Sequence, residues 1–214
     1  MFGKENYYAR KNERLWSMYW KDNDGSDIYR PNGFQEYPEE IYNLFLDLID
    51  HDGKVIDLGC GNGLMLRHLV TRSKHNLTPY GVDFIEESIK QAKEKILPNY
   101  AQNFTVSNII DVDLGINSFD FIFFDPYDVH PDDMQAMIDR LIKACKPNGK
   151  IIFYTYRDVL KALSVLKLFK LKLIRWVGDM LPKSVAKKLK RIDHEEVSIG
   201  VYEAAQSYQN LQGI

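Results

Sequence analysis

The sequence predicts an α/β fold in which a doubly wound, mostly parallel β-sheet is covered by helices on both faces. Three observations lead to this fold class. Segments with strand character alternate with segments of helical periodicity, the strand segments are almost continuously apolar, and the first of them runs into a glycine-rich turn. Continuously apolar strands are typical of parallel sheets, because helices cover both faces of such sheets. The alternation favours right-handed crossovers between parallel neighbours.

Each element of this core follows from its local pattern. We expect strands at residues 54–58, 79–82, 104–106, 119–124, 150–154 and 196–202, and helices at residues 38–50, 64–73, 86–95 and 131–145. The helical segments repeat apolar residues every three or four positions, as Ile41, Leu44 and Leu48 do. Residues 146–149 read Lys-Pro-Asn-Gly, which predicts a turn before the strand at 150–154.

Composition limits the class of protein. The 214 residues suffice for one domain with a sizeable core, and 45% apolar with 27% charged residues is typical of globular proteins. The net charge of -2 excludes neither acidic nor neutral partners. With only Cys60 and Cys145 we expect no disulfide framework and a cytoplasmic location. The N-terminus lacks a signal-peptide pattern. The sequence has no run of about 18 apolar residues, so we expect no membrane span.

The glycine-rich turn is the strongest functional signal. Residues 55–63 read Val-Ile-Asp-Leu-Gly-Cys-Gly-Asn-Gly, so three glycines stand at alternate positions after an apolar strand. Glycine allows a positive φ and lets a ligand lie against the main chain, and the following helix offers unpaired N–H groups. The dinucleotide fingerprint would need a further glycine where Leu64 stands, and the Gly-Lys-Ser/Thr of a phosphate-binding P-loop is absent.

This block resembles the first cofactor motif of the class I S-adenosylmethionine-dependent methyltransferases. Further matches are Tyr80-Gly81-Val82-Asp83, Val106-Ser107-Asn108-Ile109, and the stretch from Asn117 to Asp125 with the later turn at 146–150. Together they cover roughly residues 38–156. The resemblance implies a seven-stranded sheet whose last strand is antiparallel, S-adenosyl-L-methionine as the cofactor, and no metal site.

The resemblance also implies which residues bind the cofactor. They are Asp57, Gly59, Cys60, Gly61, Gly63, Asp83, Phe84, Asn108 and Ile109. Asp83 would accept hydrogen bonds from the ribose hydroxyls, and the carbonyl oxygen of Asn108 would accept one from the adenine amino group. Simpler interpretations stay open: Asp57 as a cap of the turn, Asp83 as an exposed acid at a strand end, Asn108 as a turn residue, and Cys60 as merely a small side chain.

Candidate catalytic residues follow the strand at 119–124. Asp125-Pro126-Tyr127 resembles the Asp/Asn-Pro-Pro-Tyr motif of methyltransferases that modify exocyclic or amide nitrogens, although it has one proline instead of two. The same Asp125 resembles a metal-binding acid of catechol-type O-methyltransferases, whose glycine motif is absent. His130 is a candidate base. The alternatives are that Asp125 and Tyr127 only shape a loop, and that His130 caps a helix or lies at the surface.

Two segments flank the predicted core. We expect the following divisions: an N-terminal aromatic cap or lid at 1–40, the α/β core at 41–156, a basic amphipathic segment at 157–192, a closing strand at 193–205 and a tail at 206–214. In the cap, a helix is expected over residues 6–20, and Tyr7, Tyr8 and Arg10 are candidates to touch a ligand. Ordinary packing against the sheet edge is the alternative. Residues 157–192 hold eleven Lys and Arg against two Asp, which suits a solvated face, a membrane surface or a polyanion.

Three functions are compatible with these patterns. The first is methyl transfer by in-line displacement to a small molecule or lipid-like metabolite. The second is methyl transfer to nitrogen in RNA or protein, which the Asp-Pro-Tyr sequence and the basic segment favour. The absence of a separate RNA-binding module and the slightly negative net charge make a nucleic-acid partner less favoured than a small molecule. The third is a non-catalytic protein that binds S-adenosylmethionine.

Overall fold

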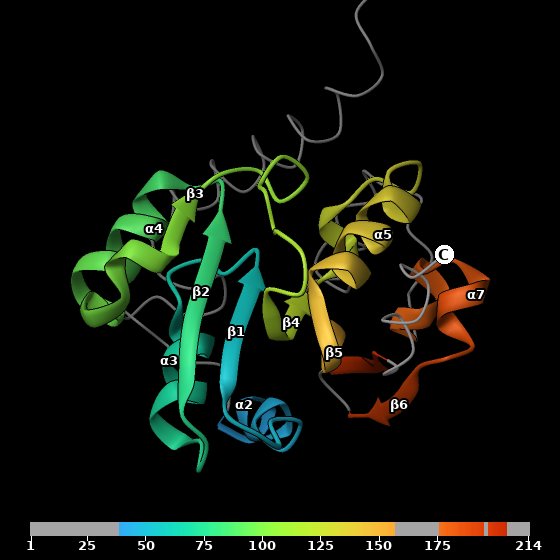
Figure 1. Ribbon diagram of the computed structural model, residues 1–214, viewed down its shortest axis with the longest axis horizontal. Coiled ribbons are helices and arrows are strands. Elements are labelled where there is room, and N and C mark those ends of the chain that lie inside the picture. Colours follow the sequence, from blue (N-terminus) through green and yellow to red (C-terminus); the bar gives the residue numbers. More distant parts are fainter. Residues whose placement is uncertain (1–38, 157–175, 195–196, 205–214) are drawn as a thin grey trace, which may run out of the picture. The chain divides into compact units, whose positions relative to one another are not determined.

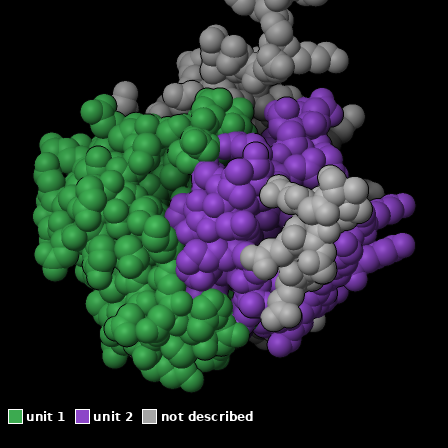
Figure 2. Space-filling model, in the orientation of Figure 1, with its two compact units in different colours: residues 1–113 green, residues 114–214 purple. Residues whose placement is uncertain are grey.

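The computed structural model describes residues 39–156, 176–194 and 197–204. Its strands form a seven-stranded sheet in the order β3-β2-β1-β4-β5-β7-β6 (Figure 1). The chain divides into two compact units, residues 1–113 and 114–214 (Figure 2). The predicted α/β class with a mostly parallel sheet is confirmed, and the last strand of the sequence, β7, is the antiparallel one.

The first unit contains a parallel three-stranded part of the sheet. Its elements are α2 (Glu39–Leu46), β1 (Gly53–Leu58), α3 (Leu64–Arg72), β2 (Leu77–Asp83), α4 (Glu86–Gln91), η2 (Ala92–Ile96), η3 (Pro98–Asn103) and β3 (Phe104–Val106). Strand β2 pairs with β1 on one side and with β3 on the other. Helices α3 and α4 pack against β2, and α2 packs against α3. The last four residues of β1, 55–58, are buried, as a strand covered on both faces requires.

The helix predicted over residues 86–95 is wrong in its second half. It is α-helical only to Gln91 and then widens into the π-helical turn η2. Leu97 donates its N–H to the carbonyl of Ala92 at 2.8 Å, which is the five-residue spacing of a π-turn. Pro98 follows directly and disfavours a helical conformation at Leu97, so the helix ends there.

The second unit contains the remaining four strands. Its elements are β4 (Phe119–Phe124), η4 (Pro126–Asp128), α5 (Met134–Ala144), β5 (Cys145–Tyr156), η5 (Val177–Met180), α7 (Lys183–Ala186), β6 (Lys190–Asp193) and β7 (Val197–Glu203). Strand β5 is parallel to β4, and β7 is antiparallel to both β5 and β6. Strand β4 is buried along its whole length, and α5 packs against β5.

Two boundaries in this unit differ from the prediction. Helix α5 begins at Met134 instead of Pro131, because the N–H groups of Asp133 and Met134 bond to the carbonyls of His130 and Pro131 in a preceding turn. The predicted turn at 146–149 is a bulge within β5: Phe119 pairs with Cys145, but Phe121 pairs with Lys150.

The flanking segments are only partly described. The predicted N-terminal helix, with Tyr7, Tyr8 and Arg10, lies outside the described residues, as do residues 157–175 of the basic segment. The described remainder of that segment is not one amphipathic element, because η5, α7 and the edge strand β6 divide it. None of the helices in the described ranges is both long and apolar enough to cross a bilayer.

Candidate functional site

The glycine turn between β1 and α3 has the backbone shape predicted from its sequence. Gly59, Gly61 and Gly63 have φ values of 93°, 52° and 82°, all in the left-handed region that favours glycine. The N–H groups of Gly59 and Cys60 donate to the carbonyl of Val82 on β2, at 2.8 and 3.0 Å. The turn is therefore tied to the end of the neighbouring strand, and its backbone carries no side chain at three alternate positions.

Asp83 holds this turn from the end of β2. One carboxylate oxygen accepts the N–H of Gly61 at 2.8 Å, and the other accepts the N–H of Ile85, also at 2.8 Å. Only 7% of Asp83 is exposed, so it is not a loose acid at a strand end. Burial raises the pKa of its carboxyl, and the bonds from Ile85 and Gly61 oppose that rise. A carboxylate has about four acceptor positions, so the position also suits contact with ribose hydroxyls.

Cys60 lies inside the turn, and Asp57 lies just before it at the end of β1. Burial, with the charges of Asp83 and Asp57, raises the pKa of the Cys60 thiol well above its usual value. The group is therefore a neutral thiol with little nucleophilic character. Asp57, the last residue but one of β1, is 2% exposed.

Phe104, the first residue of β3, fills the space behind the turn and was not identified from the sequence. A Cβ added at Gly81 would lie 2.5 Å from two atoms of the Phe104 ring and 2.7 Å from the Cys60 sulfur. A Cβ at Gly63 would lie 3.3 Å from the same ring. The one sequence signal was Gly81 itself, since a glycine inside a strand often marks a close approach.

Asn108, which follows β3 and was predicted to contact adenine, forms a hydrogen bond within its own turn. The side-chain oxygen of Asn108 accepts the N–H of Ile110 at 3.2 Å, as in a turn closed by an Asx residue. Asn108 is half-buried, Ile109 is buried, and Phe84 after β2 is half-buried. The amide oxygen predicted to meet adenine thus already supports its own turn, although it has a second lone pair.

In the second unit, Asp125 and Tyr127 form a short elbow after β4. Asp125 caps η4 by accepting the N–H of Tyr127 at 2.8 Å. Asp125 remains partly exposed, yet burial raises the pKa of its carboxyl from 3.8 to about 7, against the lowering effect of the Tyr127 N–H and of Thr155. Burial, and then the charges of Asp128 and Asp125, raise the pKa of the Tyr127 phenol. A phenol with a raised pKa stays protonated at neutral pH, and the catalytic role of Tyr127 stays a prediction.

His130 is tied to the turn that precedes α5. Its Nδ1 accepts the N–H of Asp132 at 3.2 Å and lies 3.5 Å from a carboxylate oxygen of the same residue. These contacts support the local turn, and the role of His130 as a base stays a prediction. Within the described ranges, no group of three or more His, Cys, Asp or Glu side chains is arranged to hold a metal ion.

Comparison with known proteins gives consistent matches. The family described as "Methyltransferase domain" matches residues 49–201. A tRNA N(3)-methylcytidine methyltransferase from Schizosaccharomyces pombe is 27% identical over 164 residues, which are 70% of this chain and 51% of that protein. A ubiquinone biosynthesis O-methyltransferase from Idiomarina loihiensis is 32% identical over 111 residues, 51% of this chain and 44% of that protein.

The solved structures match in fold. The N-methyltransferase NodS from Bradyrhizobium japonicum, crystallised with S-adenosyl-L-homocysteine, has a TM-score of 0.58 at 15% identity and covers 88% of this chain and 98% of that chain. The chain spans about half the length of the curated relatives it matches.

Proposed function

Because the chain belongs to the methyltransferase domain family, we propose that it is an S-adenosylmethionine-dependent methyltransferase whose acceptor is a small molecule, lipid-like metabolites included, methylated on oxygen or nitrogen. The observation that supports this proposal is Asp125. It is a partly exposed acid directly after a buried strand, with a pKa of about 7. An acid with a pKa near neutrality suits proton transfer from a hydroxyl or amino group.

The cofactor supplies an electrophilic methyl group on a sulfonium. The acceptor atom would take this methyl group in place of its proton, and that proton would pass to Asp125. Tyr127, held beside Asp125 by its own N–H, would pack against the acceptor. Much of the rate enhancement comes from holding the two reactants at attack distance, which can contribute roughly 7–11 kcal/mol. His130 is retained as a further candidate base.

The first unit would hold the cofactor. Gly59, Gly61 and Gly63 would let the amino-acid end of the cofactor lie against the main chain, beside Asp57 and Cys60. Asp83 would accept the ribose hydroxyls, in line with the common use of an acid at the end of the second strand. Phe84, Asn108 and Ile109 would surround the adenine.

The test is methyl transfer from labelled S-adenosylmethionine into a cell extract separated into small molecules, RNA and protein. We expect label in the small molecules, and loss of that label with Asp125→Asn but not with Asp128→Asn, which changes a neighbouring acid of the same elbow. Calorimetric titration with S-adenosylhomocysteine should give the same affinity for both variants, because Asp125 is not assigned to the cofactor. Label confined to macromolecules, or full activity of Asp125→Asn, would exclude the proposal.

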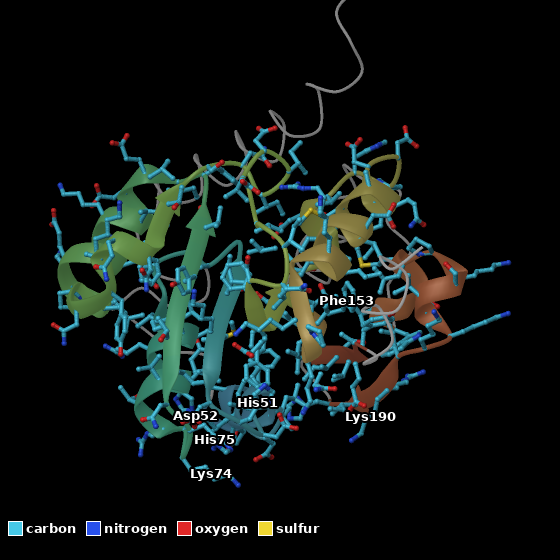
Figure 3. All side chains as sticks on the ribbon, viewed as in Figure 1. His51, Asp52, Lys74, His75, Phe153 and Lys190 are labelled. Carbon is cyan, nitrogen blue, oxygen red and sulfur yellow. The ribbon has the colours of Figure 1, made fainter. Side chains whose placement is uncertain are left out.

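A second candidate acceptor is RNA, because a cluster of cations occupies α7, the following residues and β6. Between residues 183 and 191 there are five cations and no acid, namely Lys183, Lys187, Lys188, Lys190 and Arg191, and all five are exposed. Among the described residues, no acidic side chain forms an ion pair with the four lysines. Arg191 lies over the Trp176 ring, 4.8 Å from its centre. Figure 3 shows Lys190 on the edge strand.

These exposed cations suit contact with the phosphate backbone of a nucleic acid better than insertion into a membrane surface. An interfacial helix needs exposed apolar residues next to its charges. In the described part of the chain, the exposed large apolar residues are Val106 and Ile116, and both lie outside the cluster. One curated relative acts on tRNA, which adds support for this candidate. The predicted membrane contact of residues 157–192 stays a prediction.

RNA binding is tested by fluorescence anisotropy with a labelled transfer RNA transcript. Lys187→Glu with Lys188→Glu should weaken binding about tenfold at low salt and reduce the slope of log affinity against log salt, because phosphate contacts release counterions. The matched control is Lys74→Glu with Lys90→Glu, which makes the same charge change at exposed lysines of the first unit. Equal loss in both pairs, or binding to anionic vesicles without binding to RNA, would reject this candidate.

A further inference from the structure

Helix α4 is joined to the glycine turn near both of its ends. At its start, the two carboxylate oxygens of Asp83 accept the N–H of Gly61 in the turn and the N–H of Ile85, the residue before the helix. At its end, the side-chain oxygen of Gln91 accepts a hydrogen bond from the side-chain amide of Asn62, with 3.4 Å between nitrogen and oxygen. The turn is therefore connected to the same helix twice.

The contact between Asn62 and Gln91 is buried. Asn62 is 9% exposed and Gln91 is 6% exposed. Within the part of the chain that the structure describes, neither side-chain amide has another hydrogen-bond partner. The φ of Asn62 is not positive, so the backbone of the turn does not require this residue as it requires the glycines. A buried donor without an acceptor destabilises the structure around it, so Asn62 depends on Gln91.

The helix changes its winding directly after Gln91. The π-turn η2 begins at Ala92, which accepts the N–H of Leu97 at 2.8 Å. Ala92 is buried behind the third glycine of the turn: a Cβ built at Gly63 would lie 3.6 Å from the Cβ of Ala92. Turns of this kind within a helix often occur at functional sites. Gln91 and Ala92, at the start of the widened turn, thus contact two successive residues of the glycine turn.

We propose that Gln91 is a positioning residue for cofactor binding, which holds the glycine turn in its binding shape through the side chain of Asn62. This inference rests on the proposed function, in which the turn receives the amino-acid end of S-adenosylmethionine. Gln91 lies buried on α4 and acts through Asn62. A turn that already has its binding shape binds more tightly, because less of the chain must be ordered when the ligand arrives.

The two connections of α4 to the turn differ in what they can reveal. Asp83 is assigned both to the turn and to the ribose hydroxyls, so replacing it would remove two effects at once. Gln91 is neutral and is assigned to no ligand contact. Substitution of Gln91 therefore separates support of the turn from contact with the cofactor.

The first experiment is calorimetric titration of the full chain with S-adenosylhomocysteine. Gln91→Met removes the acceptor at similar side-chain length and should weaken binding about fivefold, because the lost bond is long and neutral. Asn62→Ala removes the other half of the contact and should have a similar effect. The double variant should bind no more weakly than the more affected single variant, because one contact can be lost only once.

The matched control is Ser88→Ala, which removes a buried polar group from the same helix. Ser88 is 0% exposed, and its hydroxyl has no hydrogen-bond partner among the described residues. The change therefore leaves every contact of the glycine turn in place. S-adenosylhomocysteine should bind this variant and the unmodified chain equally well.

The second experiment observes the turn without a ligand. Cys60-Gly61 is the only Cys-Gly pair in the sequence, so carbon-13 at cysteine carbonyls and nitrogen-15 at glycine select the Gly61 amide in an NMR spectrum. This amide should exchange with solvent about tenfold faster in Gln91→Met, because a less supported turn opens more often. Its exchange should be unchanged in Ser88→Ala.

Undiminished affinity in Gln91→Met, the same loss in Ser88→Ala, or additive losses in the double variant would overturn the inference. Asn62→Ala, with the same two measurements, replaces Gln91→Met if the latter does not fold. If the unmodified chain does not bind S-adenosylhomocysteine, the proposed function fails at its cofactor. The exchange of the Gly61 amide needs no ligand, so it still decides whether Gln91 supports the turn.

Discussion

Phe104 determines which residues are tolerated at the two glycines behind and within the glycine turn, Gly81 and Gly63. Its ring occupies the space that a side chain at Gly81 would need, and it also limits the space at Gly63. The φ of Gly81 is not positive, so packing against the Phe104 ring is what excludes a side chain there. At Gly63 a side chain is disfavoured both by the φ of 82° and by the ring. At the residue scale, then, two glycines of one site are needed for different physical reasons.

Gly81→Ala should therefore destabilise the first unit. The added methyl group would meet the Phe104 ring at 2.5 Å, and overpacking of this kind costs about 1–3 kcal/mol. Urea denaturation measures the free energy of unfolding, and calorimetry measures S-adenosylhomocysteine affinity, which should also fall. Adding Phe104→Leu should recover part of the loss relative to the sum of the single changes. Simple additivity of the two substitutions would argue against the ring as the cause.

The raised pKa of Asp125 leads to a second prediction at the scale of single residues. Its pKa is raised from 3.8 to about 7 in the folded protein, so between these values the folded state binds a proton that the unfolded state has lost. Stability should therefore fall as the pH rises through this range, by on the order of 4 kcal/mol. Asp125→Asn does not titrate and should lack this part of the slope. Urea denaturation at several pH values gives the comparison, and parallel curves for both proteins would refute it.

At the scale of elements, a polar clamp joins the starts of β1 and β2. The Asp52 carboxylate accepts the backbone N–H and the side-chain amide of Asn76, both at 3.0 Å, and His75 lies 3.4 Å away (Figure 3). The N–H of Gly53 donates to the carbonyl of Asn76 at 3.0 Å. These contacts stand next to the first pair of the ladder, Gly53 with Leu77, and so support the register of the two strands.

Asp52 gives this clamp a pH dependence of the opposite sign to that of Asp125. Hydrogen bonds from the Asn76 side chain and backbone lower the pKa of its carboxyl below 3.8. Its stabilising effect is then present above the unfolded pKa and is lost as the pH falls through the lower folded value. Asp52→Ala should lower the Tm at neutral pH, and the difference from the unmodified chain should vanish in acid. A difference that persists at the lowest pH would show that charge is not involved.

At the scale of the whole molecule, ligand binding is coupled to unfolding. A ligand that binds only the folded state adds free energy of unfolding, about 2.7 kcal/mol at a hundred times its Kd. Saturating S-adenosylhomocysteine should therefore raise the Tm of the full chain. Gly61→Val should abolish this increase, because φ at Gly61 is 52° and a branched side chain is strained there. Asp52→Ala, which lies at the opposite end of β1 from the turn, should retain it, and an increase retained by Gly61→Val would refute the assignment of the turn.

The fold was predictable from the sequence because its signals are local. Strand β4 is continuously apolar and is buried throughout, and the glycines of the turn have the positive φ that their spacing indicates. The bulge in β5 and the π-turn η2 were not predictable, because they depend on how a strand or helix adjusts to its neighbours. Within the site, Phe104 was missed because its partner Gly81 lies on another strand.

The sequence by itself determined the α/β class, the backbone shape of the glycine turn and the family, since periodicity and glycine spacing are properties of short stretches of chain. Only the tertiary structure decided that Asp83 holds the turn by accepting the N–H of Gly61, and that the Phe104 ring fills the space a side chain at Gly81 would need. These contacts join residues from different elements. Burial and hydrogen bonding depend on which residues the fold brings together, and these in turn set the pKa of each carboxyl.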